Sequence, residues 1–323
     1  MSSLHPMGFS VGVAFITHEG RRHLRHCLPP VLNSELAPRV VVVNSSSQDG
    51  TVELAREMGV ETLVVPRRDF NHGATRELVR RYLGTDIAVM MTPDAYALSP
   101  GFLDKLIEPI VTGKAGVAYA RQIPHEGADF FEAFPRAYNY PEKGEIRGRD
   151  DLPRLGTYVY FCSDSCAAWS NRLLDEVGGF PVALTAEDTY AAARLVAAGH
   201  RIAYVADAVV RHSHRYSLVN EFKRYFDTGY ARMAFGNQVL LDQKDEKHGK
   251  KFVSAMISRL VQEAPLLIPY AIAAVATKYV GYKVGYYSNG FPLRLKRALS
   301  GQDYYWSSIP YLEGRETRGI LKP

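Results

Sequence analysis

The sequence contains few cysteines. The three that occur, Cys27, Cys162 and Cys166, are too few for a disulfide scaffold or a four-ligand zinc site. We expect them to be buried thiols in a reducing cytoplasm. The first six residues lack a basic start followed by an apolar run, so no secretory signal is expected there.

Long apolar runs and two common nucleotide-binding motifs are also missing. Pro265, Pro269 and Lys278 interrupt the most apolar stretch, 264–280, whereas a membrane-spanning helix needs about 20 mostly apolar residues. We therefore expect a buried or interfacial helix there. Neither Gly-x-Gly-x-x-Gly nor a phosphate loop ending in Gly-Lys-Ser/Thr occurs, which argues against a nicotinamide dehydrogenase and a simple ATPase.

The composition is that of a globular protein with unevenly distributed charge. Of the 323 residues, 46% are hydrophobic and 23% charged, which excludes a mainly disordered chain. The formal net charge of +5 combines −2 over residues 1–215 with +7 over residues 216–323. The length permits two domains. We expect a boundary near residue 215 and an anionic surface as partner of the basic second part.

Strand and helix patterns alternate over the first 121 residues. We expect strands at 10–17, 39–43, 61–66, 86–91 and 116–121, and helices at 21–33, 51–58, 73–83 and 100–111. This alternation predicts an α/β fold, a mostly parallel sheet with helices on both faces. Ligands bind beyond the carboxyl ends of the strands in such sheets. Thr17, Asn44, Arg67 and Asp94 each follow an expected strand, so we expect all four to face one crevice.

The rest of the chain is less regular at first and then helical. Residues 123–155 are aromatic, rich in proline and poor in periodicity, which indicates a long excursion over the site. A strand is expected at 157–163, a helix at 187–198 and a strand at 200–211. Beyond His214 the pattern is helical.

Two segments after expected strands suit a nucleotide. The polar turn 44–51 can present backbone N–H groups and hydroxyls to one, although a capped turn between strand and helix explains it equally. Segment 67–77 places an aromatic residue, a histidine, a glycine and an arginine at a helix start, which suits a diphosphate. A capped surface helix with basic decoration is the alternative.

Carboxylates and histidines supply further candidates. Asp94 can be a turn residue or a ligand of Mg²⁺. Glu187 and Asp188 can interact with the dipole of the helix they begin, or one of them can act as a general base. His212 and His214 are two residues apart on an extended segment, so their side chains should point to opposite sides and at most one should face the site. A metal-ligand role and a structural hydrogen bond both remain open for them.

Taken together, these segments resemble the family 2 glycosyltransferases of the GT-A fold, and most closely the bacterial rhamnosyltransferase branch that builds surface polysaccharides. The resemblance covers residues 9 to 287. The segments that carry it are 15–18, 44–51, 70–76 (Phe-Asn-His-Gly-Ala-Thr-Arg, the most branch-specific), 92–95, 121–124, 139–141, 178–181, 187–188, 212–214, 224–229 and 278–283.

The resemblance implies an inverting transfer of L-rhamnose from dTDP-L-rhamnose, with a UDP- or GDP-hexose as the alternative donor. The acceptor would be a hydroxyl of a polyprenyl-diphosphate-linked saccharide, in O-antigen or related polysaccharide biosynthesis. The implied roles are as follows: Thr17, Glu19, Asn44 and Ser46 for thymidine and ribose; Arg67, Phe70, His72, Gly73, Arg76 and Thr92 for nucleotide or diphosphate; Asp94 with His212 or His214 for Mg²⁺ or Mn²⁺; Asp188, or alternatively Glu187, as general base; Arg215, Tyr216 and Arg224 for the acceptor.

The sequence departs from the family pattern at three positions. Asn44 stands where the family often has aspartate, which affects the base contact. Thr92 takes the first acidic position of the usual metal motif, so metal binding would rest on Asp94 with a histidine. Pro93 stands where the branch usually has glutamine or serine.

The C-terminal part leaves two interpretations open. The basic run Lys244–Lys251, the cluster Arg294–Arg297 and tyrosines around the apolar helix suit the inner face of a cell membrane. A helical packing or homodimer surface is the alternative. Two other functions fit less well. At Thr17–Gly20 the chain lacks the phosphate loop that a nucleotidyltransferase needs. It also lacks a recognised nucleic-acid-binding motif, so we expect no nucleic acid as partner.

Overall fold

The computed structural model describes residues 8–239 and 246–313. The N-terminal six residues and the beginning of the basic run Lys244–Lys251, both considered above, lie outside these ranges. The strands are β1 (Val11–Thr17), β2 (Arg39–Asn44), β3 (Glu61–Val64), β4 (Ile87–Met91), β5 (Tyr96–Ala97), β6 (Val117–Ile123), β7 (Glu145–Arg147), β8 (Cys166–Ser170) and β9 (Ile202–Arg211). The helices are α1 (Arg21–Leu32), α2 (Thr51–Glu57), α3 (His72–Leu83), α4 (Phe102–Val111), α5 (Phe130–Asn139), α6 (Leu152–Leu155), α7 (Asn171–Glu176), α8 (Glu187–Ala197), α9 (Leu218–Val239), α10 (Glu246–Glu263), α11 (Ile268–Tyr286), α12 (Leu293–Leu299) and α13 (Ile309–Leu312).

The nine strands form one sheet in the order β3-β2-β1-β4-β8-β6-β9-β5, with β7 also paired to β9. Strands β1 to β4 run parallel, as do β6 and β9, whereas β8 is antiparallel to both β4 and β6. The expected mostly parallel α/β sheet is thus confirmed. From β1 the chain moves outward to β2 and β3, then returns through α3 to β4 on the other side. A crevice therefore forms at the carboxyl ends of β1 and β4.

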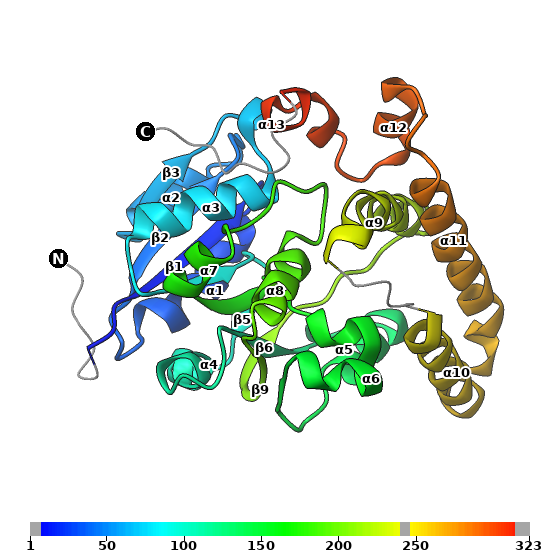
Figure 1. The fold of residues 1–323 in the computed structure, drawn as a ribbon, viewed down its shortest axis with the longest axis horizontal. Coiled ribbons are helices and arrows are strands. Elements are labelled where there is room, and N and C mark those ends of the chain that lie inside the picture. Colours follow the sequence, from blue (N-terminus) through cyan, green and yellow to red (C-terminus); the bar gives the residue numbers. More distant parts are fainter. Residues whose placement is uncertain (1–7, 240–245, 314–323) are drawn as a thin grey trace.

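Helices cover both faces of the sheet (Figure 1). Side chains alternate along β1: Val13 and Phe15 pack in the apolar core that α1 and α4 complete, and Ala14 and Ile16 pack in the core that α3 and α8 complete. Because every residue of β1 is buried, the sequence of this strand is a nearly continuous apolar run.

Two expectations for the middle of the chain need correction. The strand expected at 157–163 is wrong: residues Gly156–Tyr160 form a short 3₁₀ helix, and the strand of this region is β8, which begins at Cys166. Within the excursion 123–155 lies helix α5. Its start is a capping box, in which the Asp129 carboxylate accepts hydrogen bonds from the N–H groups of Phe131 and Glu132. Phe130, Phe134 and Tyr138 recur every four residues along this helix and their rings stack, so the expectation that the segment lacks periodicity is wrong.

The C-terminal region is helical, as expected, and packs closely on itself. Helix α11 lies along α9 (Figure 1). Glycines allow the approach: a Cβ on Gly285 would overlap the carbonyl oxygen of Phe226, and one on Gly281 would crowd that of Phe222. Within the described residues, no helix combines the length and apolar character that crossing a bilayer requires.

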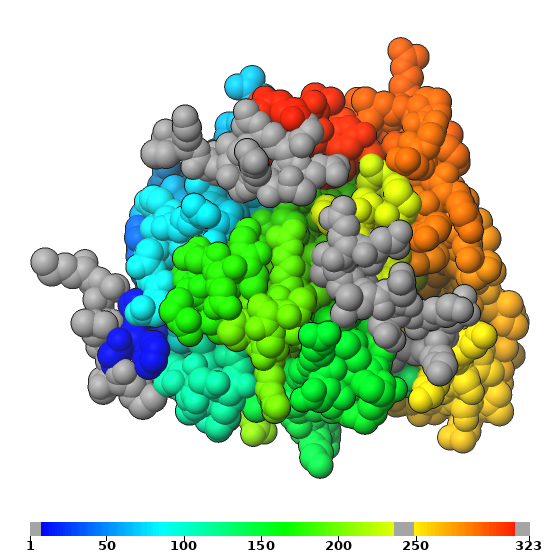
Figure 2. Space-filling model, viewed as in Figure 1, coloured from blue at the N-terminus to red at the C-terminus, as the bar shows by residue number. Residues whose placement is uncertain are grey.

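The chain after α12 returns to the N-terminal half of the sheet, where α13 lies near α3 (Figure 1). In the space-filling view this red segment lies between the cyan N-terminal elements and the orange α11–α12 region (Figure 2). Tyr305 and Trp306 from this segment form a buried cluster with Phe226 and Tyr230 of α9. The segment thus connects the helical C-terminal part to the sheet domain.

Candidate functional site

A cleft of about 960 Å³ lies at the carboxyl ends of the central strands. It is lined by the loops that follow β1, β4 and β9, by the start of α8 and by side chains from α5 and α9. The predicted site residues that line it are Glu19, His72, Arg76, Thr92, Asp94, Glu187, Asp188, His212, His214, Tyr216 and Arg224. The parallel-sheet argument therefore located the cleft correctly.

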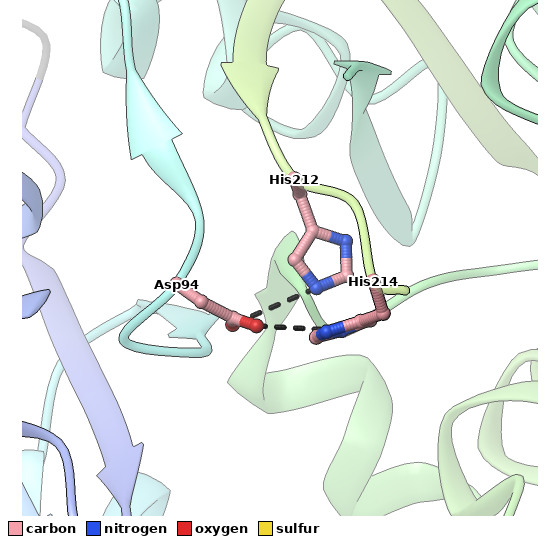
Figure 3. Close-up of side chains that lie close together, drawn as sticks. All are labelled: Asp94, His212 and His214. Carbon is pink, nitrogen blue, oxygen red and sulfur yellow. Dashed lines mark ion pairs between the residues drawn. The ribbon is translucent and has the colours of Figure 1, made fainter. Parts of the chain in front are cut away.

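One carboxylate and two imidazoles meet in this cleft. His212 Nε2 lies 3.6 Å from Asp94 Oδ1, and His214 Nε2 lies 3.3 Å from Asp94 Oδ2 (Figure 3). One ligand atom from each of the three residues lies within 4.8 Å of the others. The expectation that at most one histidine faces the site is wrong. Strand β9 ends at Arg211, so the two-residue alternation of an extended strand does not hold beyond it.

Gln122, at the end of β6, orients the His212 ring. The Gln122 amide nitrogen donates to Ser163 Oγ (2.9 Å), which places its carbonyl oxygen 2.8 Å from His212 Nδ1. His212 then carries its proton on Nδ1 and directs the free lone pair of Nε2 toward Asp94. Burial lowers the pKa of His212 to about 3, so the ring is the neutral form that binds metals.

The two acidic residues at the start of α8 have different surroundings. Glu187 is buried and forms an ion pair with Arg76, whose Nε also lies 2.8 Å from Asp164 Oδ2. Asp188 is half-buried and forms no salt bridge within the described part of the chain. Its Oδ2 accepts a hydrogen bond from the N–H of Asp164 (3.1 Å). Glu187 is thus engaged in a buried network, and Asp188 presents its carboxylate to the cleft.

The surroundings of Asp188 suit a group that exchanges protons. Burial, and next the negative charge of Glu187, raise the pKa of Asp188 to about 6, although Arg76 acts in the opposite direction. A carboxylate with a pKa near 6 is a stronger base than an ordinary aspartate and is still ionised at neutral pH. Asp188 therefore has the properties of a general base.

Strained backbone occurs beside the cleft. Only four non-glycine residues in the described ranges have positive φ. Two of them, Glu19 (51°) and Ala186 (65°), line the cleft, and a third, Ser46 (58°), lies in the polar turn after β2. Ala186 immediately precedes Glu187 and Asp188. Such conformations cost about 1–3 kcal/mol each and persist where the surrounding structure holds them. Here they turn the loops that end at the site.

Thr17 and Asn44, expected in the crevice, lie beneath it. Both are buried, and the Asn44 amide donates to Ser47 Oγ (2.7 Å) and Thr17 Oγ1 (3.3 Å). Asn44 Oδ1 also accepts from the N–H of Ser47, so the side chain closes the polar turn after β2. Of the four residues expected to share a crevice, only Asp94 lines it, because strand-end position alone does not set side-chain direction.

The segment that begins α3 is partly structural. Asn71 caps the helix through the Ala74 N–H (3.0 Å) and donates to the carbonyl of Ala183 (2.8 Å). Gly73 packs against Pro181, whose carbonyl oxygen would overlap any Cβ there. These contacts hold the start of α3 against the loop that leads to Asp188.

Arg67 and Phe70 lie under the C-terminal segment rather than in the cleft. Arg67 donates to Ser45 Oγ (3.1 Å), and its guanidinium stacks on the ring of Tyr304 at 3.9 Å. The Tyr304 ring also lies 5.6 Å from that of Phe70. A residue more than 200 positions away thus covers the predicted nucleotide side of the site.

The predicted acceptor residues lie beside the candidate metal ligands: the ring of Tyr216 is 5.3 Å from that of His214. Arg224 of α9 stacks on the ring of Tyr216 at 4.3 Å, and both line the cleft. Arg215 lines a neighbouring pocket, where its Nε lies 3.5 Å from Asp129 Oδ2. This group therefore spans the cleft and the pocket beside it.

Sequence reasoning missed Asp164, Gln122 and Tyr304. Asp164 pairs with Arg76 and supports Asp188, Gln122 orients His212, and Tyr304 stacks on Arg67. None belongs to a spacing pattern that identifies it, although Gln122 lies in segment 121–124. Other predictions held: the three cysteines are free and buried.

Comparisons with known proteins agree with this architecture. Residues 10–230 match the family described as glycosyltransferase like family 2. The chain is 33% identical over 294 residues to the O-antigen chain rhamnosyltransferase RfbN of Salmonella typhimurium, covering 87% of this chain and 90% of that protein. It is 32% identical over 289 residues to the O-antigen chain rhamnosyltransferase WbaN of Salmonella anatum, with the same coverage.

Solved structures show the same fold at lower identity. The mannosyltransferase PcManGT from Pyrobaculum calidifontis, solved with GDP-Man and Mn²⁺, superposes with a TM-score of 0.54 at 19% identity, covering 95% of this chain and 88% of that one. Residues 1–349 of S. aureus TarS superpose with a TM-score of 0.54 at 14% identity, covering 94% and 92%. These likenesses support the GT-A fold.

Proposed function

We propose, from the premise that this chain belongs to the family 2 glycosyltransferases, that it is an inverting rhamnosyltransferase of surface polysaccharide biosynthesis. The observation that carries the choice of sugar is the 33% identity to an O-antigen chain rhamnosyltransferase over nearly the whole of both chains. The proposed donor is dTDP-L-rhamnose. The proposed acceptor is a hydroxyl of a polyprenyl-diphosphate-linked saccharide.

Asp188 is the proposed general base. Its carboxylate would remove the proton of the acceptor hydroxyl as that oxygen attacks the anomeric carbon from the side opposite the diphosphate. The bond to the diphosphate breaks as the new glycosidic bond forms, so the configuration inverts. The half-buried position of Asp188, its pKa near 6 and its lack of a salt bridge in the described chain support this role over Glu187, which pairs with Arg76.

The nucleotide roles of the predicted residues remain proposals. Glu19 and His72 line the cleft. Arg76 also lines it and is held by two buried carboxylates; its predicted contact with the diphosphate stays a proposal. Arg67, stacked between Tyr304 and the polar turn, is a proposed contact to the base.

Asp94, His212 and His214 fit a divalent cation. Their donor atoms converge, and the bond from Gln122 leaves His212 Nε2 free to bind a metal. Imidazole nitrogen is a ligand of transition ions, whereas Mg²⁺ prefers oxygen. Of the two expected ions, this donor set therefore favours Mn²⁺. A cation held here would neutralise the negative charge that develops on the leaving diphosphate.

We also propose that α11 rests on an anionic membrane surface. Its side chains Ile272, Tyr279 and Val280 are 62%, 62% and 50% exposed. From residue 264 to 302 the chain has no aspartate or glutamate and five lysines or arginines. An exposed apolar stripe on a stretch of chain whose own charges are all positive suits anionic lipid headgroups. The alternative is a homodimer surface, and the boundary near residue 215 stays a prediction.

A flotation assay tests the membrane proposal. Wild-type protein should float with vesicles containing anionic phospholipid and not with purely zwitterionic ones. Ile272→Asp combined with Tyr279→Asp should abolish flotation, whereas Val219→Asp, at a side chain 65% exposed on α9, should not. Wild-type protein that stays in the bottom fraction and forms a dimer in solution would favour the homodimer surface.

A thermal-shift panel tests the donor. The protein would be titrated with dTDP-, UDP- and GDP-sugars, each with Mn²⁺, Mg²⁺ or a chelator. We expect the largest stabilisation with dTDP-L-rhamnose and Mn²⁺, since a ligand that binds the folded state raises the melting temperature. Stabilisation by UDP- or GDP-sugars alone would reject rhamnose as the donor sugar.

A further inference from the structure

A second pocket adjoins the reaction cleft. It has a volume of about 310 Å³ and lies between α5 of the sheet domain and α10 and α11 of the C-terminal part. The two cavities share His214, Tyr216, Phe131 and Glu132 as lining residues. The pocket is therefore continuous with the cleft that holds the candidate metal ligands and Asp188.

The walls of the pocket are aromatic. Phe130, Phe131 and Phe134 come from α5, Phe252 from α10 and Tyr270 from α11. Phe131 and Tyr270 meet edge to face with ring centroids 4.8 Å apart. Phe130 and Phe131 are only half-buried, and Tyr270 is 40% exposed, so ring surface remains available to a ligand.

The rim is polar but has no surplus of positive charge. Lys278 Nζ lies 3.1 Å from Glu221 Oε1, and Arg215 pairs with Asp129 at 3.5 Å. Glu132 accepts from Ser213 Oγ (3.2 Å). With each cation paired to an acid, the pocket does not suit a diphosphate. Its charged rim also does not suit an isoprenoid chain, which carries no polar groups.

A sugar ring matches these features. The faces of a pyranose are C–H groups that pack on aromatic rings, and its edge carries hydroxyls that exchange hydrogen bonds with carboxylates and ammonium groups. The volume is at the lower end of the range for small-ligand sites, about 300–1,000 Å³. It therefore suits one or two rings rather than a long chain.

We propose that this pocket binds a saccharide unit of the acceptor, adjacent to the unit whose hydroxyl is glycosylated. The proposal rests on the glycosyltransferase function proposed above. It assigns acceptor recognition to Phe131 and Tyr270, which come from opposite walls. Acceptor binding then depends on the C-terminal part of the chain, because its helices α10 and α11 form one wall of the pocket.

The test measures acceptor and donor separately. Phe131→Ala and Tyr270→Ala should each raise the acceptor KM by about three- to tenfold, the effect of one lost ring contact. Stabilisation by the donor nucleotide sugar should stay at the wild-type value. Phe131→Tyr and Tyr270→Phe keep the ring and should restore the KM. Val219→Ala, at an exposed site on α9 that lines neither cavity, is the control.

The acceptor is supplied in two forms, a lipid-free oligosaccharide and its lipid-diphosphate-linked counterpart. The proposal requires the same KM increase with both. An increase with the lipid-linked form alone would assign the pocket to the carrier lipid, and an unchanged KM with both would remove it from acceptor binding; either result overturns the proposal. Absence of donor stabilisation in the wild-type protein would instead overturn the proposed function.

Discussion

Replacement of Asp188 by asparagine removes a proton-accepting carboxylate while keeping its shape. In the structure its two oxygens accept hydrogen bonds from the N–H groups of Asp164 (3.1 Å) and Thr189 (2.7 Å). Asparagine retains one acceptor oxygen, so the loop should keep its course. General-base catalysis contributes about 10²–10⁴-fold to a rate. We expect kcat of Asp188→Asn to fall by that factor, with donor binding close to wild type.

The pKa of Asp188 sets the pH at which wild-type activity is lost. Only the ionised carboxylate can act as base, so activity should be full well above pH 6 and decline as the pH falls through about 6. One pH unit below the pKa, about a tenth of the carboxylate is ionised, and about a tenth of the activity should remain.

A second substitution tests the electrostatic reasoning. Glu187→Gln removes a negative charge that raises the pKa of Asp188 and leaves Arg76, which lowers that pKa, without this partner. The acidic limb should therefore move to lower pH.

Initial rates of transfer at pH 4.5–8 give kcat/KM profiles for the three proteins, and thermal shifts at each pH control for donor binding. Turnover by Asp188→Asn at the wild-type rate would refute the assignment of the base. An acidic limb that stays in place in Glu187→Gln would refute the proposed origin of its pKa.

Two further substitutions test packing and ligand orientation. Gly285→Ala should destabilise the fold by about 1–3 kcal/mol or more, because its Cβ would overlap the Phe226 carbonyl; Gly290→Ala, which meets open space, should leave the melting temperature unchanged. Gln122→Ala frees the ring of His212 and should weaken Mn²⁺ binding about 10–100-fold, measured by calorimetric titration. Equal melting temperatures for both glycine variants, or unchanged Mn²⁺ affinity, would contradict these interpretations.

Much of the sheet could be predicted because its signals are local. Buried strands such as β2 and β4 are continuous apolar runs, and the apolar residues of α8 recur at helical spacing. The region from 123 to 170 could not be predicted in the same way. Residues 157–163 combine aromatic and β-branched side chains that favour a strand, but the chain there packs as a short 3₁₀ helix. Tertiary packing outweighs strand propensity at such positions.

The candidate site divides in the same manner. Asp94 and Asp188 could be found from their places after a strand and at a helix start. The convergence of both His212 and His214 on Asp94 could not, because it depends on the irregular backbone after β9. Likewise, nothing local in the sequence indicates that Tyr304 covers Arg67.

The sequence by itself therefore determined the α/β class, the edge of the sheet that carries the site and the family to which the motifs belong. Those features follow from local periodicity and from residues close together in the chain. Only the tertiary structure decided that Glu187 is held by Arg76 while Asp188 is presented to the cleft. It also decided that α5 and α11 enclose a pocket beside the reaction cleft. The physical reason is that burial, ion pairing and cavity shape arise from contacts between residues far apart in sequence.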